Sequence, residues 1–175
     1  MRTKRGEGLS ARTVQYHHAV LRRSLQDAER NGLVPRNVAK LVTPPTVSRP
    51  EIRPWTPQEG RAFLAAAKGH RLETAFAIAM ATGVRQGELL GLRWSDIDWG
   101  RSALSVSKSL QRYHGQYHLE ETKTRRSVRT IPLPERLLDD IREHQRVQVA
   151  ERVFAGNSWR GDEWGLVFAT LRGNH

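Results

Sequence analysis

The chain of 175 residues contains no cysteine, few aromatic side chains and far fewer acidic than basic residues. Without cysteine, a disulfide-stabilised scaffold, a cysteine-ligated zinc site and a thiol nucleophile are all excluded. The longest apolar run, from Ala75 to Ala81, is far shorter than the roughly 20 residues that a membrane span needs. The N-terminus begins with basic residues, but no apolar stretch follows them, which argues against a secretory signal. We therefore expect a cytoplasmic protein.

Positive charge is what the chain has in excess. The 29 Lys and Arg residues outnumber the 18 Asp and Glu residues, which gives a net charge of +11 and a pI near 11.1. Such a charge favours a polyanionic partner, either nucleic acid or an acidic membrane, although an arginine-rich proteome alone would also produce it. Residues 1–53 carry 11 Lys and Arg against 4 Asp and Glu. The basic charge is therefore concentrated at the N-terminal end, and a nucleic-acid-binding protein is the simplest class.

The N-terminal third predicts a helical segment. Residues 10–31 are expected to form one amphipathic helix, with Ser10 as its N-cap and Gly32 as its stop. One face of this helix carries the residues Val14, His18, Leu21, Leu25 and Ala28. The opposite face carries three arginines, Arg12, Arg23 and Arg30. A short second helix is expected over residues 35–41. Because two such helices bury little surface, the segment is typical of half a helical bundle.

The remainder of the chain predicts a second domain after a linker. Residues 43–54 hold four prolines without periodicity, which indicates an extended, exposed segment. A capping box, with Thr56 as the cap, opens the next helix, and two further helices are expected over residues 72–82 and 85–92.

Three strands are then expected, the first containing Leu104 and Val106, the others over residues 116–121 and 128–131, with a turn at Gly115. A long helix over residues 134–154 follows. The predicted fold is mainly α with a small antiparallel β-sheet, an α+β class.

The segment A-T-G-V-R-Q-G-E-L-L-G-L-R-W-S-D-I-D, which begins at Ala81, is the most informative. It places Arg85 at the start of a helix, directly after a glycine break. Free amides at a helix N-terminus favour an anion, and a guanidinium can bind two oxygens of a phosphate. Glu88 lies three residues on, where it can hold the arginine side chain. On these residues alone, a surface Arg–Glu pair is the commoner outcome.

A second segment, E-T-K-T-R-R-S-V-R-T-I-P-L-P, begins at Glu121 and places Lys123 at a strand end in a hairpin turn. A lysine in a turn is usually solvated. Lys108, expected mid-strand on the first strand, is a second lysine of the same predicted sheet.

Both segments resemble the tyrosine recombinase (phage integrase) family. The first is similar to the family motif A-T-G-x-R-x-x-E-L-x-x-L-x-W-x-D-I-D, and the second to the family's T-K-T and R-x-I-P-L segment around its β-hairpin lysine. The resemblance implies that Arg85 grips the scissile phosphate, that Glu88 supports the site, and that Lys123 is the general acid for the leaving 5′-oxygen. A lysine suits this role because its pKa moves readily on desolvation near other cations. Lys108 is the competing candidate and lacks the motif context.

The N-terminal segment resembles the last two helices of the family's core-binding domain, through L-S-A-R-T-V and A-E-R-N-G-L-V-P-R-N-V-A. The resemblance implies a C-terminal part of a helical (SAM-like) core-binding domain over residues 1–42 and a linker over 43–54. It implies an N-terminal part of the catalytic domain over 55–175. The arginine face of the first helix is then a candidate DNA-binding surface, formed by Arg12, Arg23 and Arg30. A solvated helix face would show the same stripe.

The family's H-x-x-R box and its nucleophilic tyrosine lie downstream of the hairpin lysine. Here Tyr16, Tyr113 and Tyr117 all precede Lys123, and residues 166–173 resemble the strand before the missing half. We therefore expect a chain truncated at both ends that is inactive alone.

By resemblance, the complete enzyme carries out site-specific recombination of double-stranded DNA through a phosphotyrosine intermediate. It works as a tetramer of protomers on attachment-site DNA, in the cytoplasm with the nucleoid, without membrane, metal or cofactor. The histidines indicate no metal site: His17 and His18 point in different directions on their helix, and His114 and His118 flank the predicted turn with no carboxylate partner at ligand spacing. Two other readings stay open: a non-catalytic DNA-binding decoy or regulator, and a decayed gene fragment.

Overall fold

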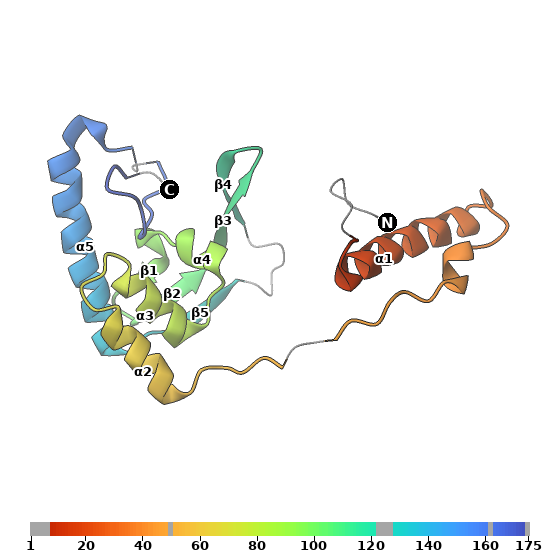
Figure 1. Cartoon of the computed structure of the whole chain (residues 1–175). Helices are drawn as coiled ribbons and strands as arrows, with labels where there is room; N and C mark the ends of the chain where they lie inside the picture. The colour runs from red at the N-terminus through yellow and green to blue at the C-terminus, as the bar shows by residue number, and fades with distance from the viewer. Residues whose placement is uncertain (1–7, 49–50, 122–127, 161–162, 174–175) are drawn as a thin grey trace. The chain divides into compact units, whose positions relative to one another are not determined.

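A computed structural model describes residues 8–48, 51–121, 128–160 and 163–173 of the chain. They belong to two compact units, residues 1–54 and residues 55–175 (Figure 1). None of the helices in these described ranges is both long and apolar enough to cross a membrane.

The first unit consists of helix α1 (Ala11–Arg30) and a short 3-10 helix, η1 (Val38–Leu41). Ser10 caps α1 as predicted, because its hydroxyl accepts the N–H of Thr13 at 3.1 Å. The second helix is shorter than the predicted 35–41. Asn37 has an extended backbone and its amide oxygen accepts the N–H of Ala39 at 3.1 Å, so the turn begins only at Val38.

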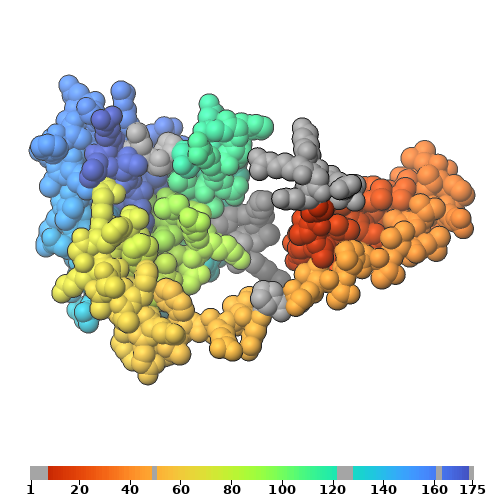
Figure 2. Space-filling model, viewed as in Figure 1, coloured from red at the N-terminus to blue at the C-terminus, as the bar shows by residue number. Residues whose placement is uncertain are grey.

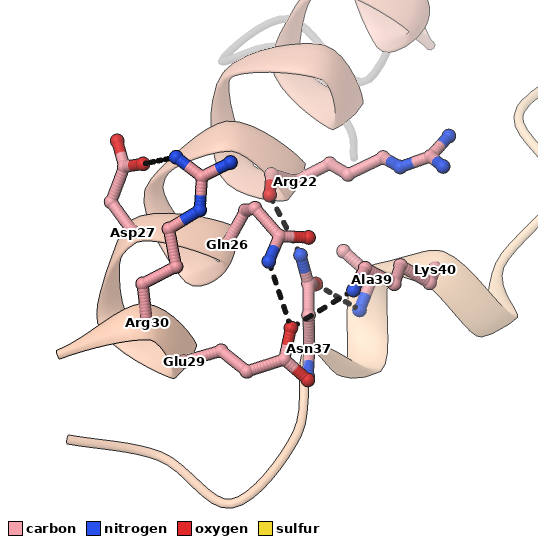
Figure 3. A network of polar contacts seen from close by, with 8 residues as sticks. All are labelled: Arg22, Gln26, Asp27, Glu29, Arg30, Asn37, Ala39 and Lys40. Atoms are coloured by element: carbon pink, nitrogen blue, oxygen red, sulfur yellow. Dashed lines mark hydrogen bonds and ion pairs between the residues drawn. The ribbon is translucent and has the colours of Figure 1, made fainter. Parts of the chain in front are cut away.

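Polar contacts hold η1 against α1 (Figure 3). The buried Asn37 donates from its side chain to the carbonyl of Arg22 at 2.8 Å, and its backbone N–H donates to Glu29 at 3.1 Å. Glu29 also accepts hydrogen bonds from Lys40 and Gln26, at 2.9 and 3.0 Å. Helix α1 has no buried residue, and Leu21 on its apolar face is 54% exposed. The unit therefore depends on this polar junction more than on an apolar core.

The second unit begins with three short helices. Helix α2 (Pro57–Ala66) has the predicted capping box, in which Thr56 and Glu59 exchange hydrogen bonds of 2.7 and 3.2 Å. Helix α3 (Glu73–Thr82) packs against α2 and against the long helix α5 (Glu135–Ala155). It ends where predicted, at Gly83, whose φ of 63° is left-handed. Helix α4 (Gln86–Leu90) begins three residues later.

The strands form two small sheets instead of the single predicted one. A three-stranded antiparallel sheet has the order β1 (Ile97–Asp98), β2 (Ala103–Val106), β5 (Arg129–Pro132). A separate hairpin pairs β3 (Lys108–Tyr113) with β4 (Gln116–Glu121). The predicted first strand is thus divided at Ser107, where the chain leaves β2 and turns onto α4. The mainly α fold with small antiparallel β-structure is otherwise confirmed.

The core of the second unit lies between α3, α5 and the three-stranded sheet. Its fully buried side chains come from each of these elements and from the C-terminal segment: Ile78, Leu104, Leu138, Ile141 and Val167. In Figure 1, α5 runs along one side of the unit and the β3–β4 hairpin stands on the other. The space-filling view shows the hairpin projecting from the body of this unit (Figure 2). The short 3-10 helix η4 (Gly156–Ser158) follows α5.

Residues 165–168 lie beside the end of the α4 segment. The N–H of Val167 donates to the carbonyl of Leu92 at 2.8 Å, and the N–H of Trp94 donates to the carbonyl of Gly165 at 3.0 Å. Gln148 on α5 bonds both to Trp94 and to the segment of residues 165–168. Its side-chain oxygen accepts the indole N–H of Trp94 at 2.7 Å, and its amide nitrogen donates to the carbonyls of Leu166 and Val167. This buried glutamine therefore satisfies polar groups that water cannot reach.

Replacing Gln148 with alanine should destabilise the second unit by about 2–4 kcal/mol, because it removes a partner of the Trp94 indole N–H and of two buried carbonyls, and leaves a cavity. The measurement is urea unfolding followed by tryptophan fluorescence. Gln145→Ala on the same helix is the control, since this side chain has no hydrogen bond among the described residues, and its effect should be small. Equal midpoints for the two variants would show that the buried contacts contribute nothing.

Two glycines let the hairpin lie directly on α4. A Cβ on Gly91 would lie 2.7 Å from the backbone nitrogen of Leu110, and one on Gly87 would lie 2.6 Å from the hydroxyl of Ser109. Both distances are far shorter than real Cβ contacts. Because the obstacle at Gly91 is backbone, it cannot be relieved by a rotamer change. These glycines of the motif segment therefore set the spacing between α4 and the hairpin.

Gly91→Ala should accordingly push β3 away from α4 and destabilise the unit by about 1–3 kcal/mol. The φ of Gly91 is −87°, which alanine adopts freely, so the cost would come from the collision alone. Gly100→Ala is the matched control, because its Cβ would meet nothing closer than 3.6 Å. Amide NMR shifts should move in β3 for the first variant only. Unchanged β3 shifts in Gly91→Ala would refute the close packing.

Candidate active site

Arg85 stands at the junction between α3 and α4. The left-handed Gly83 ends α3, and Arg85 itself is extended, with φ −69° and ψ 152°, as the N-cap of α4. Its side chain is 77% exposed to solvent. The helix start that the motif predicted is therefore present, and it presents a guanidinium outward.

Glu88 holds Arg85 from behind, as its spacing predicted. Its carboxylate accepts the Arg85 side chain at 3.0 Å and the backbone N–H of Arg85 at 2.9 Å. The Glu88 side chain is only 4% exposed, so this carboxylate is buried beneath an exposed guanidinium. Since the Arg85 N–H is already bonded and α4 is only five residues long, the guanidinium offers more to an anion than the helix end does.

Arg129 is a third member of this cluster that the sequence reasoning did not assign. It comes from β5 and donates two hydrogen bonds to the Glu88 carboxylate, at 2.8 and 3.3 Å. The only sequence signal was its place in the R-x-I-P-L segment, which gives no partner. Arg129 and Glu88 are 41 positions apart in sequence, and the fold brings the Arg129 side chain from β5 to the Glu88 carboxylate on α4.

Arginine contacts dominate the electrostatics of Glu88. The hydrogen bonds from Arg129, and then those from Arg85, lower the pKa of Glu88 to about 2 although burial opposes this shift. The same contact raises the pKa of Arg129. Glu88 is therefore ionised at neutral pH, and the three side chains together carry one net positive charge, presented at Arg85.

Of the two lysine candidates, only Lys108 is among the described residues. Lys123 lies outside the described residues, two positions after the end of β4 at Glu121. Lys108 is the first residue of β3 and pairs directly with Glu121, so it does not lie mid-strand as predicted. Its neighbours on β3 pack against α4. Lys108 therefore starts the strand that packs beside α4.

In the arm, which is the N-terminal segment of residues 1–42, the three predicted arginines are exposed, but each has a local partner. Arg23 and Arg30 both lie near Asp27, at 3.4 and 3.8 Å. Arg12 donates to the hydroxyl of Tyr16 at 3.0 Å, and its guanidinium stands over that ring.

Sequence reasoning passed over a fourth arginine of the same helix. The side chain of Arg22 points away from the polar junction in Figure 3, and within the described chain its guanidinium has no partner. Arg22 and Arg23 line a shallow hollow on α1 together with His18, Ala19 and Gln26. The adjacent Arg22–Arg23 pair was the signal in the sequence.

Within the part of the chain that the structure describes, no cluster of three His, Asp or Glu side chains is arranged to hold a metal ion. Several of the described histidines have other contacts. His18 bonds the carbonyl of Ala39 at 2.9 Å, and His118 stacks on Tyr113 with 3.8 Å between ring centroids. His144 bonds the carbonyl of Val167 at 2.8 Å, and burial lowers its pKa.

Known proteins resemble this chain along nearly its whole length. It is 34% identical to a XerC-like tyrosine recombinase of Caldanaerobacter subterraneus subsp. tengcongensis, over 96% of this chain and 47% of that protein. It is 32% identical to an integrase of Streptomyces ambofaciens, over 97% of this chain and 44% of that protein. The chain thus spans about half the length of these curated relatives.

Among solved structures, the integrase of transposon Tn1549 in complex with transposon right end DNA has the same fold. It superposes with a TM-score of 0.74 at 24% identity, over 95% of this chain and 54% of that one. The XerA recombinase superposes less closely, with a TM-score of 0.53 at 19% identity, over 76% of this chain and 40% of that one. The model of the phage integrase family matches residues 55–174, the whole of the second unit but its last residue. The chain therefore belongs to the phage integrase family of tyrosine recombinases.

Proposed function

We propose that this chain carries the first part of a DNA-strand-transfer site and acts in site-specific recombination of double-stranded DNA. The observation that supports this most is the exposed guanidinium of Arg85, held on a buried carboxylate at the start of a helix. A cation fixed in this way is organised before a phosphate arrives, which is the arrangement that stabilises charge in a transition state. Glu88 keeps Arg85 in that position, and family membership is consistent with the same reaction.

In the proposed reaction, a tyrosine hydroxyl attacks a DNA phosphate, so a 3′-phosphotyrosine bond forms and the bond to the 5′-oxygen breaks. Arg85 binds the phosphate oxygens while negative charge gathers on them. Lys123 gives its proton to the leaving 5′-oxygen. The free 5′-hydroxyl then attacks the phosphotyrosine of a partner strand, which restores a phosphodiester without ATP.

The 175 residues hold Arg85, Glu88 and Lys123, but no tyrosine follows Lys123 among them. We therefore propose that this chain by itself does not cleave DNA. The H-x-x-R residues and the nucleophile would come from a catalytic half that follows in the complete family pattern. The complete enzyme would act as a tetramer on its attachment site, in the cytoplasm at the nucleoid.

The arm is proposed to bind the DNA backbone. In this layout, residues 1–42 are part of a core-binding domain, 43–54 a linker and 55–175 part of the catalytic domain. The proposed phosphate contacts are the exposed arginines of α1, which are Arg12, Arg23 and Arg30, with Arg22 added from the structure. Because Asp27 lies within 4 Å of both Arg23 and Arg30, it lowers the charge available to a phosphate.

Binding of the 175-residue chain to a DNA duplex should be weak and strongly dependent on salt. If about five phosphates are neutralised, the logarithm of the association constant should fall with the logarithm of salt concentration at a slope of about −4 to −5. Fluorescence anisotropy with a labelled duplex measures this slope. A slope near zero would exclude backbone binding.

A charge-matched pair of variants locates the contact. Asp27→Asn should tighten DNA binding by about two- to fivefold at low salt, because it frees Arg23 and Arg30 from a competing carboxylate. Asp139→Asn changes the net charge equally at an exposed Asp–Arg pair on α5, and should have little effect. Equal tightening by both variants would mean that net charge acts and not the arm.

The roles of the cations can be tested in a chimaera in which the C-terminal part of the relative of 34% identity follows residue 175. In that chimaera, Arg85→Ala should lower cleavage by about 10²–10³-fold with little loss of DNA binding, because one phosphate among many is affected. Lys123→Ala should be rescued in part by a 5′-bridging phosphorothiolate, whose sulfur leaves without a proton. Arg85→Ala should not be rescued.

Lys108→Ala is the matched lysine control for that experiment. Rescue of Lys108→Ala instead of Lys123→Ala would transfer the acid role to Lys108, and equal rescue of both arginine and lysine variants would contradict the assignment. The unextended 175-residue chain serves as the negative control, and it should give no protein–DNA band that survives SDS on a nicked suicide substrate.

A further inference from the structure

Glu88 is bound by two arginines that differ in how far they can leave it. The side chain of Arg129 is 32% exposed and belongs to a strand of the three-stranded sheet, whereas that of Arg85 is 77% exposed. In β5, Arg129 is paired in register with Val106 of β2. The backbone of Arg129 is thus fixed by the sheet, whereas Arg85 is the residue just before α4 and its side chain reaches into solvent.

The hydrogen bonds of the carboxylate show the same asymmetry. Arg129 contacts both oxygens of Glu88, at 2.8 and 3.3 Å, and the Arg85 side chain contacts one, at 3.0 Å. The backbone N–H of Arg85 supplies a further bond at 2.9 Å. If the Arg85 side chain turned away, Glu88 would keep three hydrogen bonds and a full counter-charge. If Arg129 were lost, the buried carboxylate would keep the backbone N–H of Arg85, but its only counter-charge in this cluster would be a side chain that is mostly in water.

A buried carboxylate without a partner is strongly unfavourable, whereas an exposed arginine contributes little to an ion pair. We infer that Arg129 is a positioning residue of this site: it carries the charge of Glu88 permanently, so that Arg85 is free to leave Glu88 for an anion of the phosphate class. The inference rests on the proposed function for the identity of that anion. The part of the inference that gives Arg129 the pairing of Glu88 does not depend on which anion Arg85 binds.

Because Glu88 titrates at about 2 in the folded chain and near 4.5 when unperturbed, it contributes stability above pH 4.5 that is lost as the pH falls through about 2. Removal of Arg129 should move the folded pKa back toward or above 4.5. The gap in stability between native chain and Arg129→Ala should therefore be largest above pH 4.5 and narrow between pH 4.5 and 2. For Arg85→Ala the gap should stay small across this range.

The test is urea unfolding of the 175-residue chain and its variants between pH 2 and 7. At pH 7, Arg129→Ala should raise the unfolding equilibrium constant by about two orders of magnitude, and Arg85→Ala by about threefold or less. Arg136→Ala, an exposed arginine of α5 without a partner among the described residues, controls for loss of one positive charge. The double variant Arg129→Ala with Glu88→Gln should recover much of the loss, because no charge is then buried.

A carboxyl NMR titration of Glu88 covers the case in which Arg129→Ala does not fold. In Arg85→Ala the pKa of Glu88 should stay near 2. A rise to about 4.5 in that variant, or equal pH profiles for the two arginine variants, would overturn the role of Arg129.

A titration with inorganic phosphate, followed by the NMR signals of the Arg85 side chain, tests whether Arg85 is free to leave Glu88 for an anion. The signals should shift saturably in the native chain and in Arg136→Ala, and the response should be several-fold weaker in Arg129→Ala, where Glu88 competes for Arg85. Equal phosphate affinity in Arg129→Ala would overturn the release of Arg85 by Arg129. No response in the native chain would refute the phosphate grip of the proposed function, whereas the pH profiles would still decide what Arg129 does.

Discussion

The carboxylate of Glu88 is the charge around which the second unit is organised. It is buried and ionised on α4, and its partners are the side chain and backbone amide of Arg85, just before α4, and the side chain of Arg129 on β5. Since a buried charge must be paired, the arrangement requires β5 to lie next to the start of α4. The three-stranded sheet is in turn held by the apolar core under α3 and α5. The exposed position of Arg85 thus depends on contacts that reach most of the unit.

A steric constraint acts on a neighbouring face of α4. Gly87 and Gly91 face β3 so closely that no side chain fits between them, and the hairpin is therefore placed by contact with the helix that follows Arg85. Polar bonding at Glu88 and close packing at the glycines fix the same five-residue helix from two directions. A helix this short has little stability of its own, so its position comes almost wholly from these neighbours.

Sequence reasoning succeeded where the signal was local. The Thr56–Glu59 capping box, the stop at Gly83 and the Arg85–Glu88 contact each involve residues within three positions or a single glycine, and all are present. Sequence reasoning failed where contacts between distant segments determine the structure. The division of the first strand at Ser107 and the pairing of Arg129 with Glu88 need knowledge of which elements become neighbours, and no periodicity reports that. The predicted second helix starts three residues late, at Val38, because Asn37 is extended and its side chain makes a long-range bond to Arg22.

The number of Lys and Arg residues overstates the number of cations that are available to bind a DNA backbone on this chain. Of the arginines on α1, two share Asp27 and one stands on a tyrosine ring, while the guanidinium of Arg22 is unpaired among the described residues. In the second unit, Glu88 neutralises one of two neighbouring arginines and leaves a single net charge at the exposed one. Carboxylates in both units thus determine which cations are available to phosphate. The placement of the 18 acidic side chains therefore matters as much for a polyanionic ligand as the excess of +11.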